Sequence, residues 1–350
     1  MIENRKAEHV TICATKPVQA NYNYWDDIFL IHRALPELDK PEIDLSATLF
    51  GKRLQAPIII SAMTGGYSKA KEINLNLAQA AAEYQIGFGV GSQRPALEDS
   101  RFVESYTVVK DFDIPLVIGN IGAPQLIKQS TKHKPLTLED GKSALDMLNA
   151  DLLAIHLNFV QEIVQPEGDT NARGCLRKII EFSKELPILA KETGAGISKE
   201  MAKALKTAGV KGIDVGGLGG TSFPAVEIYR GQSIGDVFRA KLGETFWNWG
   251  IPTPISVIEA DVGLPLIATG GNRNGLDAAK GLCLGASASG FAGRLLKPAM
   301  KSAKEVIKEL ELIIEELRSA LFLIGVRSVQ QAKKQRVIIT GKTKEILESM

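Results

Sequence analysis

Eight short apolar runs, spread along most of the 350-residue chain, constrain its fold more than any other feature. The runs are continuously apolar rather than alternating, which is typical of parallel strands covered on both faces. Helical patterns separate them, and eight βα units favour a single (β/α)8 TIM barrel. A doubly wound open sheet is the alternative, but no G-x-G-x-x-G follows the first run. The predicted strands are 56–62, 86–92, 114–120, 151–157, 187–192, 212–217, 264–270 and 286–292.

The barrel is expected to carry an extension at each end and one insertion. Residues 1–50 would form an N-terminal arm that is part of the same domain, and residues 51–325 the barrel itself. Residues 326–350 would form a C-terminal extension packed on the barrel. The connection at 218–263, after the sixth strand, is long, and a loop of that length in a compact domain is usually functional or mobile.

Two segments predict helices with clear boundaries. At 198–209, Ser198 is a plausible N-cap and Gly209 a plausible residue just past the helix end. At 302–325, apolar residues recur at helical spacing and predict a long helix that covers the barrel.

Composition argues against several classes of protein. The net charge is +2 with both signs mixed along the chain, whereas nucleic-acid-binding proteins usually carry a clear basic bias. The cysteines Cys13, Cys175 and Cys283 form neither a disulfide framework nor a CxxC pair, so a reducing cytoplasm is expected. No run of about 18 apolar residues occurs, so a membrane is not an expected partner. The mixed charge makes a nucleic acid an unexpected partner as well.

Nearly every predicted strand ends in polar or glycine-rich residues. In a (β/α)8 barrel these endings gather on one face, where the active site is built. Glycine turns at strand ends are ordinary and explain one or two endings, but they explain eight poorly. The sequence therefore predicts a ligand site at this face. The endings are MTGG (63–66), GSQR (91–94), GN (119–120), HLNFVQE (156–162), KETG (191–194), GGLGGTS (216–222), TGGNRNG (269–275) and GFAGR (290–294).

The endings of the last two strands predict a phosphate site. Loops after strands seven and eight of such barrels frequently bind phosphate through backbone N–H groups and a helix N-terminus. We expect one phosphate near Gly270, Gly271, Arg273, Ala292 and Gly293. The alternative is a pair of tight βα turns with no ligand.

A second group of basic side chains predicts a second and more highly charged anion. Arginine forms bidentate contacts with phosphate, and lysine supplies a point charge. The group comprises Arg5, Lys6, His9, Arg94 and His156. The alternative, that charges near the N-terminus are simply solvated, is equally plausible for the first two on their own.

The stretch HLNFVQE and the fifth strand add three candidate functional groups. Glu162 could bind Mg²⁺, which is commonly held by one or two carboxylates together with substrate phosphates. It could instead pair with a nearby lysine or arginine. Gln161 does not titrate and would act only through hydrogen bonds. Lys191 could form a Schiff base, as in aldolases, or donate to an electron-rich cofactor.

The motifs together resemble the type 2 isopentenyl-diphosphate isomerases. The similarity runs from about residue 4 to about residue 300 and rests on the RKxEH start (Arg5, Lys6, Glu8, His9), GSQR, HLNxxQE, KETG, GGTS and a late GG-x-R. It implies an FMN-containing (β/α)8 enzyme that interconverts isopentenyl and dimethylallyl diphosphate in isoprenoid biosynthesis. It also implies Mg²⁺ and NADPH as reductant of the flavin. The reaction would add and remove protons at reduced FMN with no net redox change.

The resemblance also assigns residues and an assembly. Glu162 would bind Mg²⁺, and Gln161, Lys191 and His156 would be catalytic. Family members are commonly homo-oligomers, here expected to be tetramers or octamers. The substrate would contact Arg5, Lys6, His9, Arg94, His156, Asn158 and Gln161, with Thr193 possible. FMN would contact Ala62, Met63, Thr64, Ser92, Asn120, Lys191, Thr221, Gly271, Arg273, Ala292 and Gly293. The chain departs from the family pattern at Gly293-Arg294, where more apolar residues are usual.

Four other interpretations stay open. A 2-hydroxy-acid oxidase needs a histidine near the late strands, and no histidine follows His156. An inosinate-dehydrogenase-like enzyme needs a cysteine in the loop after the sixth strand, and 218–263 contains none. An aldolase would use Lys191, and a non-catalytic barrel would bind phosphates without chemistry.

Overall fold

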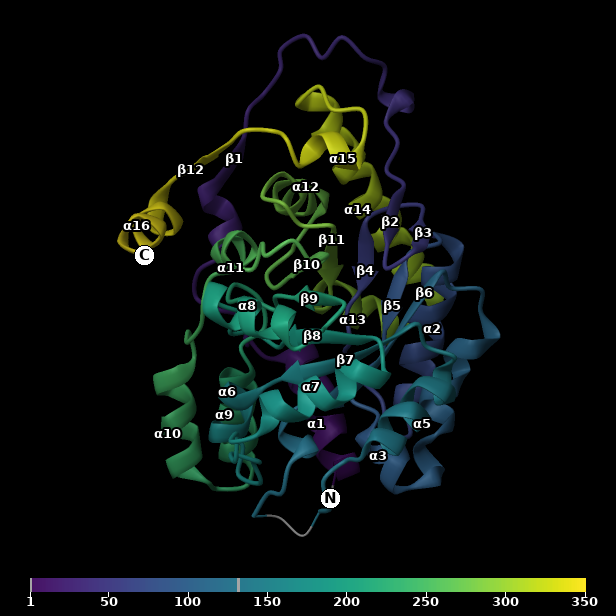
Figure 1. Cartoon of the computed structure of the whole chain (residues 1–350), viewed down its shortest axis with the longest axis vertical. Helices are drawn as coiled ribbons and strands as arrows, with labels where there is room; N and C mark the ends of the chain where they lie inside the picture. Colours follow the sequence, from purple (N-terminus) through teal and green to yellow (C-terminus); the bar gives the residue numbers. More distant parts are fainter. Residues whose placement is uncertain (1, 131–132) are drawn as a thin grey trace.

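The computed structural model describes residues 2–130 and 133–350 and contains a closed barrel of eight parallel strands (Figure 1). Each predicted apolar run supplies one strand, so the predicted (β/α)8 barrel is confirmed. The strands are β4 (Ile58–Ile60), β5 (Gly87–Gly89), β6 (Leu116–Gly122), β7 (Leu152–Leu157), β8 (Ile188–Glu192), β9 (Gly212–Asp214), β10 (Leu266–Thr269) and β11 (Ala288–Phe291). Neighbours pair in chain order, and β11 closes the barrel against β4.

Apolar side chains fill the barrel, and a β-hairpin seals one end of it. The hairpin pairs β2 (Ala47–Leu49) with β3 (Lys52–Leu54), and a leucine from each strand joins the buried cluster inside the barrel. Phe50, between the two strands, lies against Gly212 at the start of β9. The hairpin therefore lies at the N-terminal ends of the strands, and ligands have access at the C-terminal ends.

Helices cover the outside of the barrel. The predicted helix at 198–209 is confirmed as α8 (Lys199–Thr207), with Ser198 capping its start and Gly209 at φ +88° just beyond its end. The predicted helix at 302–325 is confirmed as α14 (Ala303–Leu323). The remaining barrel helices are α2 (Ala70–Glu83), α3 (Arg94–Glu98), α4 (Glu104–Thr107), α5 (Leu138–Leu148), α6 (Phe159–Val164), α7 (Cys175–Glu185), α12 (Gly275–Cys283), α13 (Gly293–Ala299) and α15 (Val329–Ala332).

The long insertion predicted after the sixth strand, at 218–263, is confirmed, and it is largely helical. Ser222 caps the first helix, and Pro224 lies in its first turn, where the missing N–H has no helical partner to lose. The connection contains α9 (Phe223–Ser233), α10 (Val237–Phe246) and α11 (Thr253–Glu259). Helices α9 and α10 pack against each other and against α6, so the insertion presents side chains to the ends of the barrel strands.

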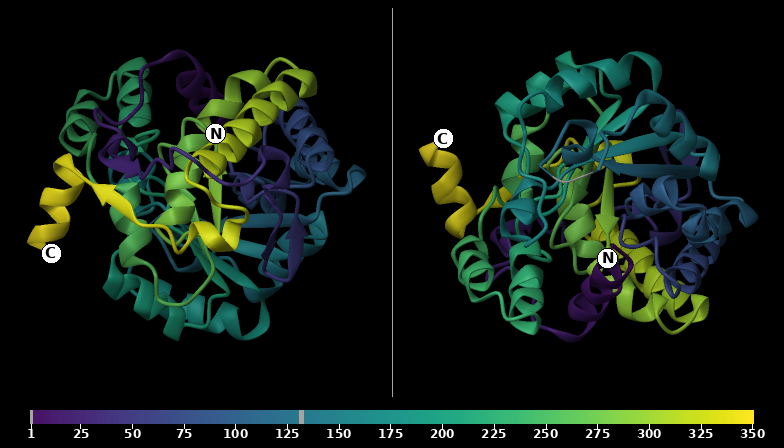
Figure 2. Two further views of the ribbon diagram at one scale, coloured as in Figure 1. Left: turned by 90° about the horizontal axis from the view of Figure 1, so that it is seen from above. Right: turned by 90° about the horizontal axis from the view of Figure 1, so that it is seen from below.

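The two extensions meet on the surface of the barrel. Helix α1 (Ile2–Thr15) packs against α9 and α13. Strand β1 (Ile28–Leu30) pairs antiparallel with β12 (Val337–Ile339), which leads into α16 (Gly341–Ser349) (Figure 2). The boundaries expected at residues 50 and 325 stay predictions. Within the described residues, none of the helices combines the length and the apolar character needed to span a membrane.

Candidate active site

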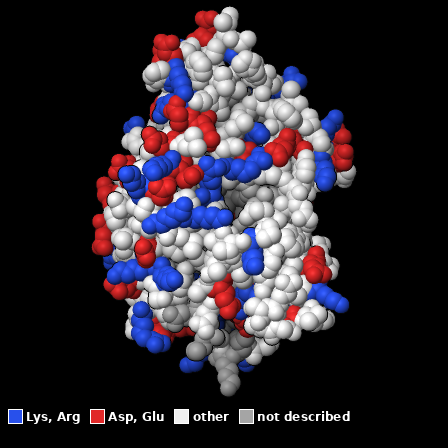
Figure 3. All heavy atoms as spheres, turned by 180° about the vertical axis from the view of Figure 1, so that it is seen from behind, with Lys and Arg blue, Asp and Glu red and all other residues white. Residues whose placement is uncertain are grey.

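A cavity of about 660 Å³ lies at the C-terminal ends of the barrel strands. Ligand pockets usually measure about 300–1,000 Å³. On the face opposite to that of Figure 1, Lys and Arg side chains border a hollow (Figure 3). Every residue predicted to bind substrate, cofactor or metal lines this cavity, although the individual roles stay predictions. They are Arg5, Lys6, His9, Ala62, Met63, Thr64, Ser92, Arg94, Asn120, His156, Asn158, Gln161, Glu162, Lys191, Thr221, Gly271, Arg273, Ala292 and Gly293.

One side of the cavity, the glycine side, is made largely of backbone from three loops at 216–221, 270–273 and 292–293. Gly271 has φ +73°, and a Cβ added there would lie 2.6 Å from Gly219 O. Backbone cannot move aside as a flexible side chain can, so this position accepts only glycine. The first two loops therefore pack backbone against backbone and leave peptide groups beside the cavity.

Two arginines near the glycine side are engaged by carboxylates. Arg273 forms ion pairs with Asp277 (2.9 Å) and Asp26 (2.6 Å), and the hydrogen bonds that it donates to both carboxylates raise its pKa. Arg273, which was predicted to contact a phosphate, is therefore a cation held in place by two carboxylates. Arg294, at which the chain departs from the family pattern, donates from Nε to Glu309 at 2.6 Å.

Lys191 lies between the two sides, at the end of β8. Its Nζ is 3.0 Å from Asp214 and donates to Glu192 O at 3.1 Å, so both contacts fix its position. The neighbouring Glu192 points away and accepts hydrogen bonds from three backbone N–H groups of the following loop. Burial raises the pKa of Glu192 to about 7 despite these bonds.

His156 is neutral in this environment. Burial, together with the nearby charges of Lys6 and Lys191, lowers its pKa to about 3. The amide nitrogen of Asn120 donates to Val90 O, so its Oδ1 faces His156 and accepts from Nδ1 at 2.7 Å. His156 therefore adds no positive charge for an anion at neutral pH and offers hydrogen bonding instead.

The other side of the cavity, the charged side, combines α1 with residues that follow β5, β7 and β9. Lys6 donates from Nζ to Ser92 O at 2.8 Å. Burial, together with Arg5 and Arg94, lowers the pKa of Lys6 to about 7. Three cations so close together are stable only with anions nearby, which supports the prediction of an anionic ligand.

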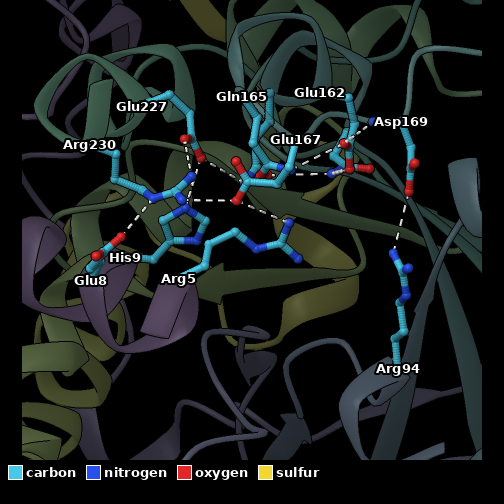
Figure 4. Close-up of polar contacts among 12 residues, drawn as sticks. Arg5, Glu8, His9, Arg94, Glu162, Gln165, Glu167, Asp169, Glu227 and Arg230 are labelled. Atoms are coloured by element: carbon cyan, nitrogen blue, oxygen red, sulfur yellow. Dashed lines mark hydrogen bonds and ion pairs between the residues drawn. The ribbon is translucent and has the colours of Figure 1, made fainter. Parts of the chain in front are cut away.

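Carboxylates from the insertion and from the β7–α7 connection contact two of the predicted basic residues (Figure 4). His9 Nε2 lies 2.7 Å from Glu227 Oε1, and Arg5 lies 3.6 Å from Glu167. Glu227 has no exposed surface, yet its pKa is lowered, because His9 and Arg230 outweigh the effect of burial. The arm is thus fixed over the cavity by a contact with the buried Glu227 and by a partly exposed ion pair with Glu167.

Arg230, on α9, is the centre of this network. It contacts Glu8 at 2.9 Å, Glu167 at 2.9 Å and Glu227 at 2.6 Å (Figure 4). Burial would lower its pKa, but the three carboxylates raise it above its usual value. Sequence reasoning identified neither Arg230 nor Glu227. The one available signal was Glu8 within the RKxEH start, which needs a basic partner if it is buried.

Gln161, on α6, lies at the centre of a chain of weak contacts. Its Nε2 donates to Glu227 Oε1 and to Gln165 Oε1, both at 3.4 Å. Asn158 Nδ2 is 3.4 Å from its Oε1. These long contacts orient the amide without saturating it, so Gln161 can still bind a ligand group.

Glu162 is buried and held by amide groups. Its Oε1 accepts from Asn158 Nδ2 at 2.8 Å, and its Oε2 accepts from Asp169 N at 2.7 Å. Burial raises its pKa. In the described part of the chain no lysine or arginine forms an ion pair with it, which weighs against the ion-pair alternative. Asp169 also binds Arg94 at 3.3 Å, so the carboxylate and the cation belong to one connected group.

The barrel and its cavity place the chain in a class of flavin-binding barrels. Residues 9–101 and 142–339 match the FMN-dependent dehydrogenase family. An isopentenyl-diphosphate delta-isomerase from Thermoplasma volcanium is 47% identical over 348 residues, covering 99% of this chain and 100% of that protein. One from Methanosarcina mazei is 46% identical, covering 98% and 94%. The chain belongs to the isopentenyl-diphosphate delta-isomerase family.

Solved structures confirm the fold only. A mandelate oxidase variant with a monooxide FMN adduct superposes with a TM-score of 0.62 at 20% identity, covering 95% of this chain and 92% of that one. A mandelate oxidase variant with (S)-mandelic acid gives 0.63 at 18% identity, covering 97% and 96%. Both share the barrel, and the sequence similarity is too low to carry the chemistry.

Proposed function

We propose that this chain interconverts isopentenyl diphosphate and dimethylallyl diphosphate, with FMN and the substrate bound side by side in the cavity. The observation that carries the proposal is that one cavity combines a backbone cradle on the glycine side with a cluster of basic side chains on the charged side. A flavin phosphate and a diphosphate need two separate anion sites. The family relationship to named isomerases supports the same substrates.

FMN fits the glycine side. Gly271 and its neighbours bring peptide groups to the cavity wall with no Cβ in the way. The phosphate would bind near Gly271, Arg273, Ala292 and Gly293, where α13 begins and its first N–H groups have no helical partner. The ring would extend toward Lys191, whose ammonium group favours an anionic reduced flavin. NADPH is the proposed reductant.

The substrate diphosphate fits the charged side. Arg5 has Glu167 as its carboxylate partner at 3.6 Å, and Arg94 has Asp169 at 3.3 Å and, on Nε, Glu98 at 2.8 Å. The contacts with Glu167 and Asp169 are long for ion pairs, and a diphosphate would replace them with shorter ones, while Glu98 continues to orient Arg94. Lys6 would gain an anion at short range, which raises its pKa and keeps it charged when substrate is bound.

Mg²⁺ fits only as an ion shared with the substrate. Among the described residues, no group of three or more His, Cys, Asp or Glu side chains can hold a metal. Glu162 offers one carboxylate, and the neighbouring Asn158 Oδ1 is a buried oxygen without a hydrogen-bond partner in the described residues. One carboxylate plus phosphate oxygens and water is the usual Mg²⁺ arrangement.

For the double-bond shift, the protein would position the substrate and exclude water from the cavity. When bound, reduced FMN supplies a proton donor and acceptor and an electron-rich face that stabilises developing positive charge. Gln161 would orient the hydrocarbon chain, and neutral His156 would hydrogen-bond the diphosphate without repelling the basic cluster. Helix α1 would exclude water above the reacting carbons. No net redox change results. We also propose a cytoplasmic homo-oligomer, a tetramer or an octamer.

Anaerobic conversion of isopentenyl diphosphate tests the proposal. FMN, NADPH and Mg²⁺ are supplied together and then omitted one at a time. We expect conversion that needs all three, with no stoichiometric consumption of NADPH. Absence of conversion by protein with bound flavin would reject the isomerase assignment and leave the flavin assignment in place.

One alternative within the FMN-dependent dehydrogenase family is a 2-hydroxy-acid oxidase. The histidines that line the cavity are His9, which is paired with Glu227, and His156, whose pKa is about 3. Neither lies near the late strands. Bleaching of the bound flavin by a 2-hydroxy acid would revive this alternative.

A further inference from the structure

Two side chains of the N-terminal arm bond to the backbone of the glycine side. Trp25 Nε1 donates to Gly270 O at 3.0 Å, and Asn23 Nδ2 donates to Gly271 O at 2.8 Å. Trp25 is completely buried and does not line the cavity. Both come from the segment 22–27, here called the brace, which includes the 3-10 helix Tyr24–Asp27.

The direction of these bonds fixes the direction of the next amides. In a planar trans peptide, the C=O of one residue and the N–H of the next point to opposite sides. Because the carbonyl groups of Gly270 and Gly271 point at the brace, the N–H groups of Gly271 and Asn272 point away from it. These residues line the cavity, and neither N–H donates to a protein acceptor in the described part of the chain.

The brace is itself held from behind. Asp27 is 4% exposed and accepts hydrogen bonds from Tyr22 Oη, Thr343 N and Thr343 Oγ1. Lys280 Nζ donates to Trp25 O at 2.7 Å. Strand β1 follows the brace directly, and its partner β12 lies shortly before Thr343 in the sequence. The C-terminal segment, the brace and the glycine side thus form one hydrogen-bonded series.

We infer that Trp25 is a positioning residue for the phosphate group of the flavin. It acts through Gly270 and Gly271, with Asn23 beside it, and Thr343 keeps it in place through Asp27. The inference rests on the proposed function, because it assumes that the flavin phosphate lies at 270–273. It also assigns a role in cofactor binding to Trp25 and Thr343, which do not line the cavity and which neither the motifs nor the pattern of strand endings indicated.

Comparing FMN with riboflavin isolates this role, because riboflavin lacks only the phosphate. The full-length protein, freed of flavin, is titrated with each ligand by fluorescence. For Trp25→Phe, which keeps an aromatic ring and removes the N–H, we expect FMN affinity to fall about tenfold, as loss of one hydrogen bond allows. Riboflavin affinity should change less than about twofold. Thr343→Val should reduce the ratio of FMN affinity to riboflavin affinity about threefold. The exposed control Trp249→Phe should leave this ratio unchanged.

The possible outcomes distinguish an error in the location of the phosphate site from an error in the positioning role of Trp25. A wild-type protein that binds FMN and riboflavin equally would overturn the phosphate site, and the inference with it. A wild-type preference for FMN that persists in Trp25→Phe would overturn the positioning role alone. If Trp25→Phe does not fold, as judged by circular dichroism, Thr343→Val decides, because its side chain does not touch the phosphate loop. An undiminished preference in that variant rejects the inference.

Discussion

The two sides of the cavity offer a ligand opposite kinds of polar contact. The glycine side uses peptide groups at positions such as Gly271, where a Cβ would lie 2.6 Å from backbone. The charged side uses long side chains such as Arg5 and Arg94, each with its own carboxylate. Peptide groups do not titrate and hardly move, whereas ion-paired side chains exchange partners and respond to pH. A fixed cofactor suits the first arrangement, and a substrate that must leave suits the second.

The largest expected effect is on the glycine side. Gly271→Ala places a side chain at φ +73° and 2.6 Å from Gly219 O. The left-handed conformation costs about 1–2 kcal/mol, and overpacking costs a further ~1–3 kcal/mol. FMN affinity should fall on the order of several hundredfold, measured by flavin fluorescence. Gly235→Ala is the matched control, because it has a similar φ of +76° and nothing within 4 Å. Equal losses in both variants would reject steric recognition.

The Gln161→Ala variant tests whether catalytic turnover can be lost while FMN stays bound. Gln161→Ala should lower kcat roughly 100-fold, the lower end for loss of a group acting directly on the reaction. Bound flavin, read from its absorbance, should be unchanged, because the nearest contacts of Gln161 belong to Asn158, Gln165 and Glu227. Turnover near that of the wild type would exclude Gln161 from the mechanism.

Removal of residues 1–9 takes Arg5, Lys6 and His9 from the charged side. KM for isopentenyl diphosphate should rise about 30-fold, which corresponds to the net loss of one charged hydrogen bond of about 1.5–3 kcal/mol, because α1 no longer covers the site. FMN affinity should fall far less. If KM is unchanged, these residues are solvated, as the sequence alone allowed.

The smallest expected effect is a pH dependence confined to the charged side. Lys6 has a pKa of about 7, lowered mainly by burial, so it loses its charge as pH rises through 7. Since kcat/KM reports groups of the free enzyme, it should fall about fivefold between pH 7 and 8. In Lys6→Arg the cation persists, and the fall should disappear. A fall of the same size in both proteins would assign the titration to another group.

The strands could be predicted because burial on both faces leaves a continuous apolar run. HLNFVQE marked the charged side, because an imidazole, two amides and a carboxylate directly after such a run have no role in a core. The glycines of 269–275 marked the other side. Each of these sequence signals lies within a single βα unit, so it can be recognised from a short stretch of the chain.

The partners of these residues could not be predicted, because they lie far away in the sequence. His9 meets Glu227 across 218 positions, and Arg273 meets Asp26 across 247. Nothing near either residue indicates which carboxylate it contacts. The protonation of His156 was missed for a related reason: its pKa depends on burial and on Lys6 and Lys191, which only the folded chain brings together.

The pairing of β1 with β12 also bears on how the protein is made. The chain is synthesised from its N-terminus, so all eight barrel strands, which end at Phe291, exist before Val337–Ile339 and Thr343 leave the ribosome. Until then, β1 lacks its partner and Asp27 lacks a donor that secures the brace. We therefore expect the nascent barrel to be assembled before it can hold FMN firmly. Flavin retention would then report that synthesis has passed Thr343 and that the segment around it has folded.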